Sequence, residues 1–127
     1  MGGRGGSSGL SNVKSQKSSL IDISKMPDLT GSEKQVKWAS DIREKAVQKI
    51  NSALKFYEDR MKSNPKIETY EDEVSATREI RKTMEAVFSQ TTSAAKIIEN
   101  RGLFDERRIS NEIENLVTQY RNKRRMR

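Results

Sequence analysis

The sequence contains no cysteine and no histidine. The absence of cysteine excludes disulfide bonds, thiol nucleophiles and thiolate metal sites. The absence of histidine removes the commonest metal ligand and the commonest general base near neutral pH. The glycines at positions 3–8 miss the last glycine of the dinucleotide-binding motif, so they predict no phosphate cradle. We therefore expect a protein that is not an enzyme and that binds no metal and no cofactor.

Apolar residues are also scarce. Of the 127 residues, 32% are hydrophobic and 34% are charged, and the longest apolar runs have two or three residues. A helix that crosses a membrane needs about 20 apolar residues in succession. The length suits one domain. We expect a single soluble domain with a thin core and no membrane partner.

The chain divides by composition into a tail, an arm and a helical region. Eleven of the first twenty residues are Gly or Ser, and such a segment buries too little apolar surface to become ordered. We expect residues 1–19 to be disordered. Residues 20–29 are more apolar, and Pro27 disfavours helix at Met26. This arm is expected to pack weakly, or to order only on a partner, so that residues 1–29 precede one helical domain over 30–127.

Three helices are predicted, over residues 32–63, 69–100 and 105–122. Ser32 and Gln35 fit the capping-box pattern at the first start, Pro65 ends the first helix, and Gly102 follows the second. No alternation of period two is long enough for a sheet. We expect an all-α fold, in which a long antiparallel hairpin and a shorter third helix form a three-helix bundle. The third helix is too short to cover the hairpin, which leaves apolar surface for a second chain.

Positive charge gathers on one face of the first predicted helix. The net charge is +7, and helical periodicity places six lysines opposite the apolar residues. These lysines are Lys34, Lys37, Lys45, Lys49, Lys55 and Lys62, and Asp41 and Asp59 interrupt their stripe. Trp38 and Phe56 lie at the edge of this face, so that one interpretation is a surface that meets phosphates and stacks on bases or a partner. The other interpretation is a solvent-exposed helix face on which oppositely charged residues four positions apart form ion pairs, namely Glu33/Lys37, Asp41/Lys45 and Glu58/Lys62.

The last seven residues contain a second basic cluster. It consists of Arg121, Lys123, Arg124, Arg125 and Arg127. One interpretation is a cationic helix end that suits the macrodipole and otherwise frays, which accounts for one or two of the charges. The other is a basic arm for nucleic acid or another polyanion. Arg43 falls among the apolar residues of the first helix, where we expect it to reach solvent or pair with a carboxylate. The alternative is a contact with a partner across an interface.

Two segments resemble small uncharacterised proteins of phages and mobile elements of Gram-positive bacteria. The segments are GSEKQVKWASDIREKA at 31–46 and SAAKIIENR at 93–101. The resemblance implies a phage or mobile-element origin, no enzymatic activity and no defined site. It places the protein in the cytoplasm of a bacterial host, with the virion as the alternative location.

The predicted function is binding. We expect a module that engages nucleic acid or a host complex of nucleic acid and protein, and an inhibitor of a bacterial defence system, similar to an anti-CRISPR protein, is one concrete form. The alternative is a structural or assembly protein of the virion that oligomerises through its helices.

Overall fold

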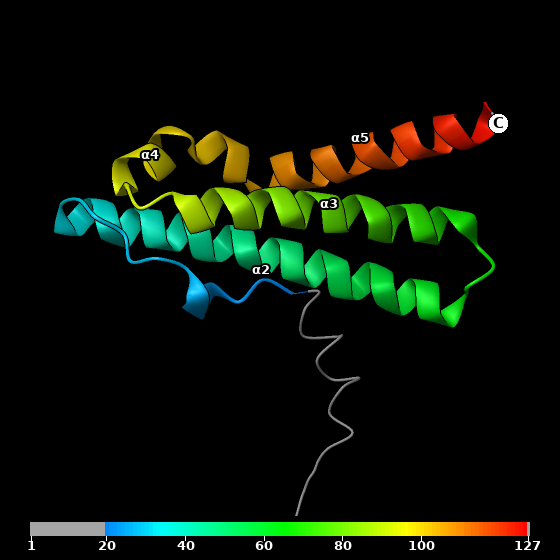
Figure 1. Ribbon diagram of the computed structural model, residues 1–127, viewed down its shortest axis with the longest axis horizontal. Coiled ribbons are helices and arrows are strands. Elements are labelled where there is room, and N and C mark those ends of the chain that lie inside the picture. Colours follow the sequence, from blue (N-terminus) through cyan, green and yellow to red (C-terminus); the bar gives the residue numbers. More distant parts are fainter. Residues whose placement is uncertain (1–19, 127) are drawn as a thin grey trace, which may run out of the picture.

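The computed structural model describes residues 20–126, all of whose regular structure is helical (Figure 1). The elements are η1 (Ile23–Lys25), α2 (Glu33–Ser63), α3 (Glu68–Gln90), α4 (Ala94–Glu99), η2 (Arg101–Phe104) and α5 (Glu106–Arg125). The prediction of an all-α fold is confirmed, with four α-helices of which three are long. The predicted disorder of residues 1–19 lies outside the described part of the chain. No helix within that part is both long and apolar enough to cross a membrane.

α2 is the longest helix, and local signals set its two ends. The Ser32 hydroxyl accepts a hydrogen bond from the Gln35 backbone N–H, while the Gln35 side chain accepts one from the Ser32 N–H, each at 3.2 Å. At the other end the Asn64 N–H donates to the Arg60 carbonyl at 3.0 Å. α3 then returns antiparallel to α2, and α5 lies along α3 (Figure 1).

The prediction of one continuous helix over residues 69–100 is wrong, because the chain leaves the helical conformation between α3 and α4. The Thr91 hydroxyl donates to the Val87 carbonyl at 2.7 Å, at the end of α3. The Ser93 hydroxyl accepts the Lys96 N–H at 3.3 Å and so caps a new helix. These Thr and Ser side chains offer the backbone bonds that compete with a continuous helix. The third predicted helix also differs, since α5 continues to Arg125.

Backbone hydrogen bonds to Thr30, just before α2, fix this break between α3 and α4. The Thr30 N–H donates to the Thr92 carbonyl at 2.7 Å, and the Ala94 N–H donates to the Thr30 carbonyl at 2.9 Å. Gly31 follows with a φ of 145°, a conformation that disfavours side chains. The residues before α2 are thereby joined to the residues before α4.

The core lies where α2, α3, α4 and α5 meet. Its largest fully buried side chains are Phe88, Ile50, Leu54, Ile97, Ile109, Val74 and Thr77. The ring of Phe88 packs against that of Phe104 with centroids 4.8 Å apart. This aromatic contact joins α3 to η2 and so holds the turn that leads into α5.

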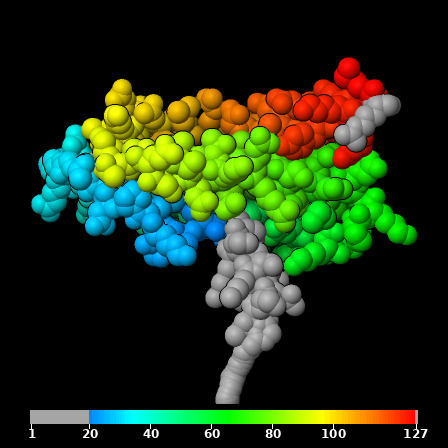
Figure 2. All heavy atoms as spheres, viewed as in Figure 1, coloured from blue at the N-terminus to red at the C-terminus, as the bar shows by residue number. Residues whose placement is uncertain are grey.

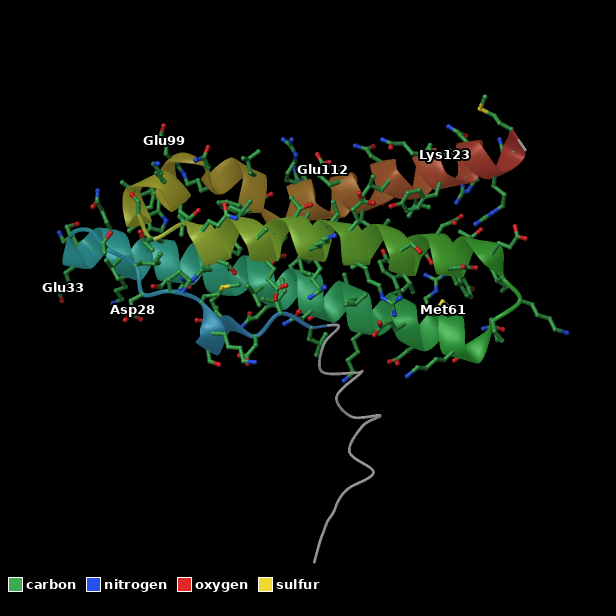
Figure 3. The ribbon with its side chains drawn as sticks, viewed as in Figure 1. Asp28, Glu33, Met61, Glu99, Glu112 and Lys123 are labelled. Carbon is green, nitrogen blue, oxygen red and sulfur yellow. The ribbon has the colours of Figure 1, made fainter. Side chains whose placement is uncertain are left out.

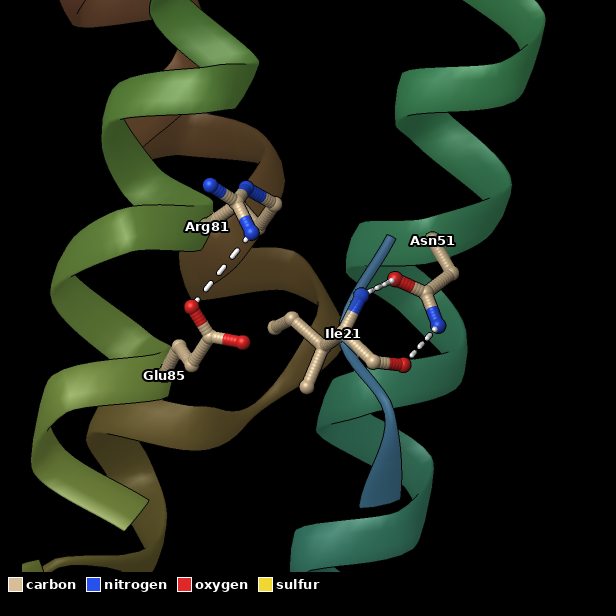
Figure 4. Close-up of polar contacts among 4 residues, drawn as sticks. All are labelled: Ile21, Asn51, Arg81 and Glu85. Atoms are coloured by element: carbon tan, nitrogen blue, oxygen red, sulfur yellow. Dashed lines mark hydrogen bonds and ion pairs between the residues drawn. The ribbon is translucent and has the colours of Figure 1, made fainter. Parts of the chain in front are cut away.

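The arm packs firmly on the helices, which corrects the expectation of weak packing. Ile21 is only 4% exposed. The Asn51 side chain holds it, accepting from the Ile21 N–H at 2.8 Å and donating to the Ile21 carbonyl at 3.0 Å (Figure 4). In the space-filling view the blue atoms of the arm lie directly against the neighbouring helical atoms (Figure 2).

Arg43 is the second anchor of the arm. Its Nη1 donates to the Pro27 carbonyl at 2.8 Å, whereas its Nε is buried without a hydrogen-bond partner. Burial lowers the pKa of the guanidinium, and the nearby Asp28 charge opposes that effect. Arg43 was expected to reach solvent or to pair with a carboxylate. It instead donates a hydrogen bond to the main chain of the arm.

Candidate functional site

The outer face of α2 carries the residues that the sequence singled out on the first helix. We call this set the α2 face, and it comprises Lys34, Lys37, Trp38, Lys45, Lys49, Lys55, Phe56 and Lys62. All are exposed except Lys49, which is half-buried. Trp38 and Phe56 are 50% and 56% exposed, respectively. Large aromatic side chains that stay open on a helix already packed on its other side are available to a partner.

Trp38 lies beside an arginine that comes from a distant part of the chain. The guanidinium carbon of Arg101, in η2, is 5.3 Å from the centroid of the indole ring. The Arg101 Nη1 also donates to the Ile98 carbonyl at 2.8 Å, which fixes the side chain in place. Lys34 and Lys37 line the same shallow depression as Trp38, with a volume of about 480 Å³, and so do the carboxylates Asp41 and Glu44. The helix itself places two lysines and two carboxylates around the exposed ring, and the tertiary structure adds the Arg101 guanidinium.

Phe56 forms a second aromatic group near the other end of α2. Its ring meets that of Tyr57 edge-on, with centroids 5.4 Å apart. The Arg60 guanidinium lies 5.4 Å from the Phe56 centroid and 4.3 Å from that of Tyr70. Hydrogen bonding to the Tyr70 side chain raises the pKa of Arg60, desolvation opposes this effect, and the Glu73 charge adds to it. Arg60 is therefore a permanent cation held between two rings.

The predicted ion pairs along α2 are mostly absent. Asp41 and Lys45 form one at 3.3 Å, with side chains 59% and 66% exposed. Glu58 instead pairs with Arg78 of α3 at 2.9 Å. Within residues 20–126, Lys45 is the only lysine of the α2 face with an ion pair. Two of the three predicted ion pairs on this face are therefore wrong. The third, Asp41–Lys45, contributes only about 0.2–1 kcal/mol to stability because it is exposed.

The basic cluster near the C-terminus divides into two parts. Arg124 binds both carboxylate oxygens of Asp72, which is 5% exposed, and approaches Glu68 at 3.4 Å. Its predicted role as a free cation is thus corrected, because it ties the end of α5 to the start of α3. Hydrogen bonding to Asp72 raises the pKa of Arg124.

The other members of the cluster remain open to solvent. Arg121, Lys123 and Arg125 are exposed, and Arg127 lies outside the described residues. In Figure 3, Lys123 lies at the opposite end of the molecule from Glu33, which begins α2. The fold therefore does not bring this cluster to the surroundings of Trp38.

Two site residues were missed by sequence reasoning. Arg101 was noted only as part of a resembling segment, and Arg60 was not singled out. A contact between Arg101 and Trp38 joins residues far apart in the sequence, so no local spacing signals it. Arg60 follows Phe56 by four residues on one helix, and that spacing is a signal that could have found it.

The acidic residues of the described part of the chain are not grouped as metal ligands. Residues 20–126 contain no group of three or more His, Cys, Asp or Glu placed to hold a metal ion. No protein-family model, curated protein or solved structure matches the chain. Function is therefore argued from the geometry of the α2 face.

Proposed function

We propose that this protein is a non-enzymatic binding module that engages a nucleic acid, alone or in a complex with protein, through the α2 face. The observation that carries the proposal is the half-exposed Trp38 ring beside Arg101. Lys34 and Lys37, which form no ion pair in the described structure, border it together with Asp41 and Glu44, and Asp41 is paired with Lys45. Lysines neutralise phosphates, and an aromatic ring stacks on a base or a protein side chain. The net charge of +7 favours approach to a polyanion.

The proposal extends to origin and architecture. The resemblance of 31–46 and 93–101 to phage and mobile-element proteins supports action in the cytoplasm of a bacterial host. An inhibitor that masks a nucleic-acid site of a defence complex, in the manner of an anti-CRISPR protein, is one concrete form. We propose that α2, α3 and α5 act together as a three-helix bundle that holds the face rigid.

Intrinsic fluorescence gives a direct test, because Trp38 is the only tryptophan in the chain. Mixed-sequence DNA and RNA are titrated at about 50 mM and about 300 mM salt while the emission of Trp38 is recorded. Contact with three phosphates predicts an affinity that falls about 40- to 130-fold over this range, since each contributes about 0.7–0.9 to the salt slope. Affinity that does not change with salt would remove the nucleic acid from the proposal.

A matched pair of variants separates local contact from net charge. Lys37→Glu and Lys82→Glu change the net charge equally, and both lysines are exposed, but Lys82 lies on α3. We expect Lys37→Glu to weaken binding and reduce the salt slope by about one, and Lys82→Glu to change neither appreciably. Equal effects of the two variants would contradict a site on the α2 face.

The alternative function, a virion protein that oligomerises, is favoured by a different surface. A groove of about 290 Å³ between α3, η2 and α5 is lined by apolar side chains that include Val87 and Leu103. These two side chains are 39% and 50% exposed. Sedimentation velocity at tens of micromolar distinguishes the candidates, because an assembly protein forms oligomers there and a monomer contradicts this alternative.

A further inference from the structure

The two exposed aromatic rings lie on one line along α2. Trp38 and Phe56 are separated by 18 positions in an uninterrupted helix. At 3.6 residues per turn this separation is about five full turns, and at 1.5 Å per residue it is about 27 Å. Both rings therefore project from the same side of the helix, and both are about half exposed.

Each ring is supported by a guanidinium group. Arg101 lies 5.3 Å from the Trp38 centroid, and Arg60 lies 5.4 Å from the Phe56 centroid. Arg60 is itself stacked on Tyr70 at 4.3 Å, which restricts its movement. A planar guanidinium beside an aromatic ring can stack on a base or bind a phosphate. The chain thus presents two platforms at the two ends of one line, and the Arg60 guanidinium of the second also lies 3.8 Å from the Glu73 carboxylate.

Two lysines occupy the interval between the platforms. Lys45 and Lys49 follow Trp38 by about two and three turns, so they lie within a narrow strip of the same side. Lys45 is paired only with the exposed Asp41. A phosphate can replace such a partner at little cost, because an exposed pair contributes little.

The arm leaves this line open. Its anchors on α2 are Arg43 and Asn51, which bind Pro27 and Ile21. Helical periodicity places Arg43 and Asn51 about 140° around the axis from Trp38, on opposite sides. The segment 20–29 therefore covers another part of α2.

The geometry points to a single-stranded nucleic acid as the ligand of the α2 face, lying along the helix with bases stacked at Trp38 and Phe56 and with phosphates on Lys45 and Lys49. This inference rests on the proposed function and names its substrate class. In a duplex the faces of the bases are already stacked on one another, so a protein ring cannot reach them without unstacking, whereas a single strand exposes them. At about 3.4 Å per nucleotide, 27 Å corresponds to about eight steps of a stacked strand, and an extended strand needs fewer.

The length of the ligand tests the two-platform geometry. Labelled oligothymidine and oligouridine of about 4 and about 12 nucleotides, and a duplex of about 12 base pairs, are titrated at low salt. Anisotropy measures affinity, and Trp38 emission reports on its platform. Phe56→Leu removes the second ring, Phe56→Tyr retains it, and Val87→Ala removes exposed apolar surface from α3 as a control.

We expect the longer single strand to bind more tightly than the duplex. Phe56→Leu should weaken its binding by about 5- to 150-fold, the effect of losing one stacked base, and should change the affinity of the short strand by no more than about twofold, because that strand can still bind at Trp38. Phe56→Tyr and Val87→Ala should retain the original affinity. A duplex that binds as tightly, or a Phe56→Leu variant without a length-dependent loss, overturns this inference while leaving the proposed function intact. Absence of binding to every oligonucleotide overturns both.

Discussion

Replacement of Asn51 by alanine should release the arm from α2. Asn51 both accepts from the Ile21 N–H and donates to the Ile21 carbonyl, at 2.8 and 3.0 Å. A hydrogen bond of this kind contributes about 0.5–1.5 kcal/mol net, so the two together contribute about 1–3 kcal/mol. The variant should therefore open the arm about 5- to 150-fold more often.

Hydrogen exchange measures this opening directly. The Ile21 amide is protected by Asn51, so its exchange rate follows the population of the open arm. Exchange is followed by mass spectrometry on peptides that span residues 20–29, in the original chain and in Asn51→Ala. Gln48→Ala serves as the matched control, because Gln48 is an exposed amide on the same helix that bonds Glu44 rather than the arm.

The expected result is faster exchange in residues 20–29 of Asn51→Ala and unchanged exchange there in Gln48→Ala. Exchange in Asn51→Ala that stays within about twofold of the original would refute the reasoning, because the two bonds would then contribute too little to hold the arm. Equal acceleration in both variants would likewise refute it, since the effect would belong to α2 as a whole.

Three further predictions concern stability and ionisation. Gly31→Ala should lower the free energy of unfolding, measured by urea denaturation, by about 1–3 kcal/mol, because the φ of Gly31 is 145° and a Cβ there would lie 3.3 Å from the Ala94 Cβ. Gly102→Ala is the control and should lower that free energy far less, because a Cβ at Gly102 would have no heavy atom within 4 Å. Asp72→Asn should lower the same free energy by about 1–3 kcal/mol at an unchanged denaturant slope, because the buried carboxylate that holds Arg124 loses its charge. The hydrogen bond to the Glu79 carboxylate raises the pKa of Tyr120 from 10.0 to about 12. This bond stabilises the fold fully below about pH 10 and is lost as the pH rises toward 12, so the phenolate absorbance of the folded protein should lose its highest-pH step in Tyr120→Phe.

Features set by neighbouring residues could be predicted from the sequence. The start of α2 follows from Ser32 and Gln35, whose mutual bonds span three residues. The exposure of its lysines and of Trp38 follows from helical periodicity, because the apolar side of α2 must face the core. The all-helical class follows in the same way from period and caps.

Features set by distant residues could not be predicted. Thr91 and Ser93 mark the break between α3 and α4 locally, but the bond from Thr30 to Thr92 that fixes it spans 62 positions. Arg124 is not free to bind a partner because it binds Asp72, which lies 52 positions away in the sequence. The packing of the arm depends on Asn51, 30 positions from Ile21.

The sequence by itself thus determined the helical class and which side of α2 meets solvent, because both depend on a repeat of a few residues along one helix. The tertiary structure alone decided which cations remain free and that Trp38 gains Arg101. Those outcomes depend on which residue of another element packs within a few ångströms. The spacing of residues along one helix holds no information about that neighbour.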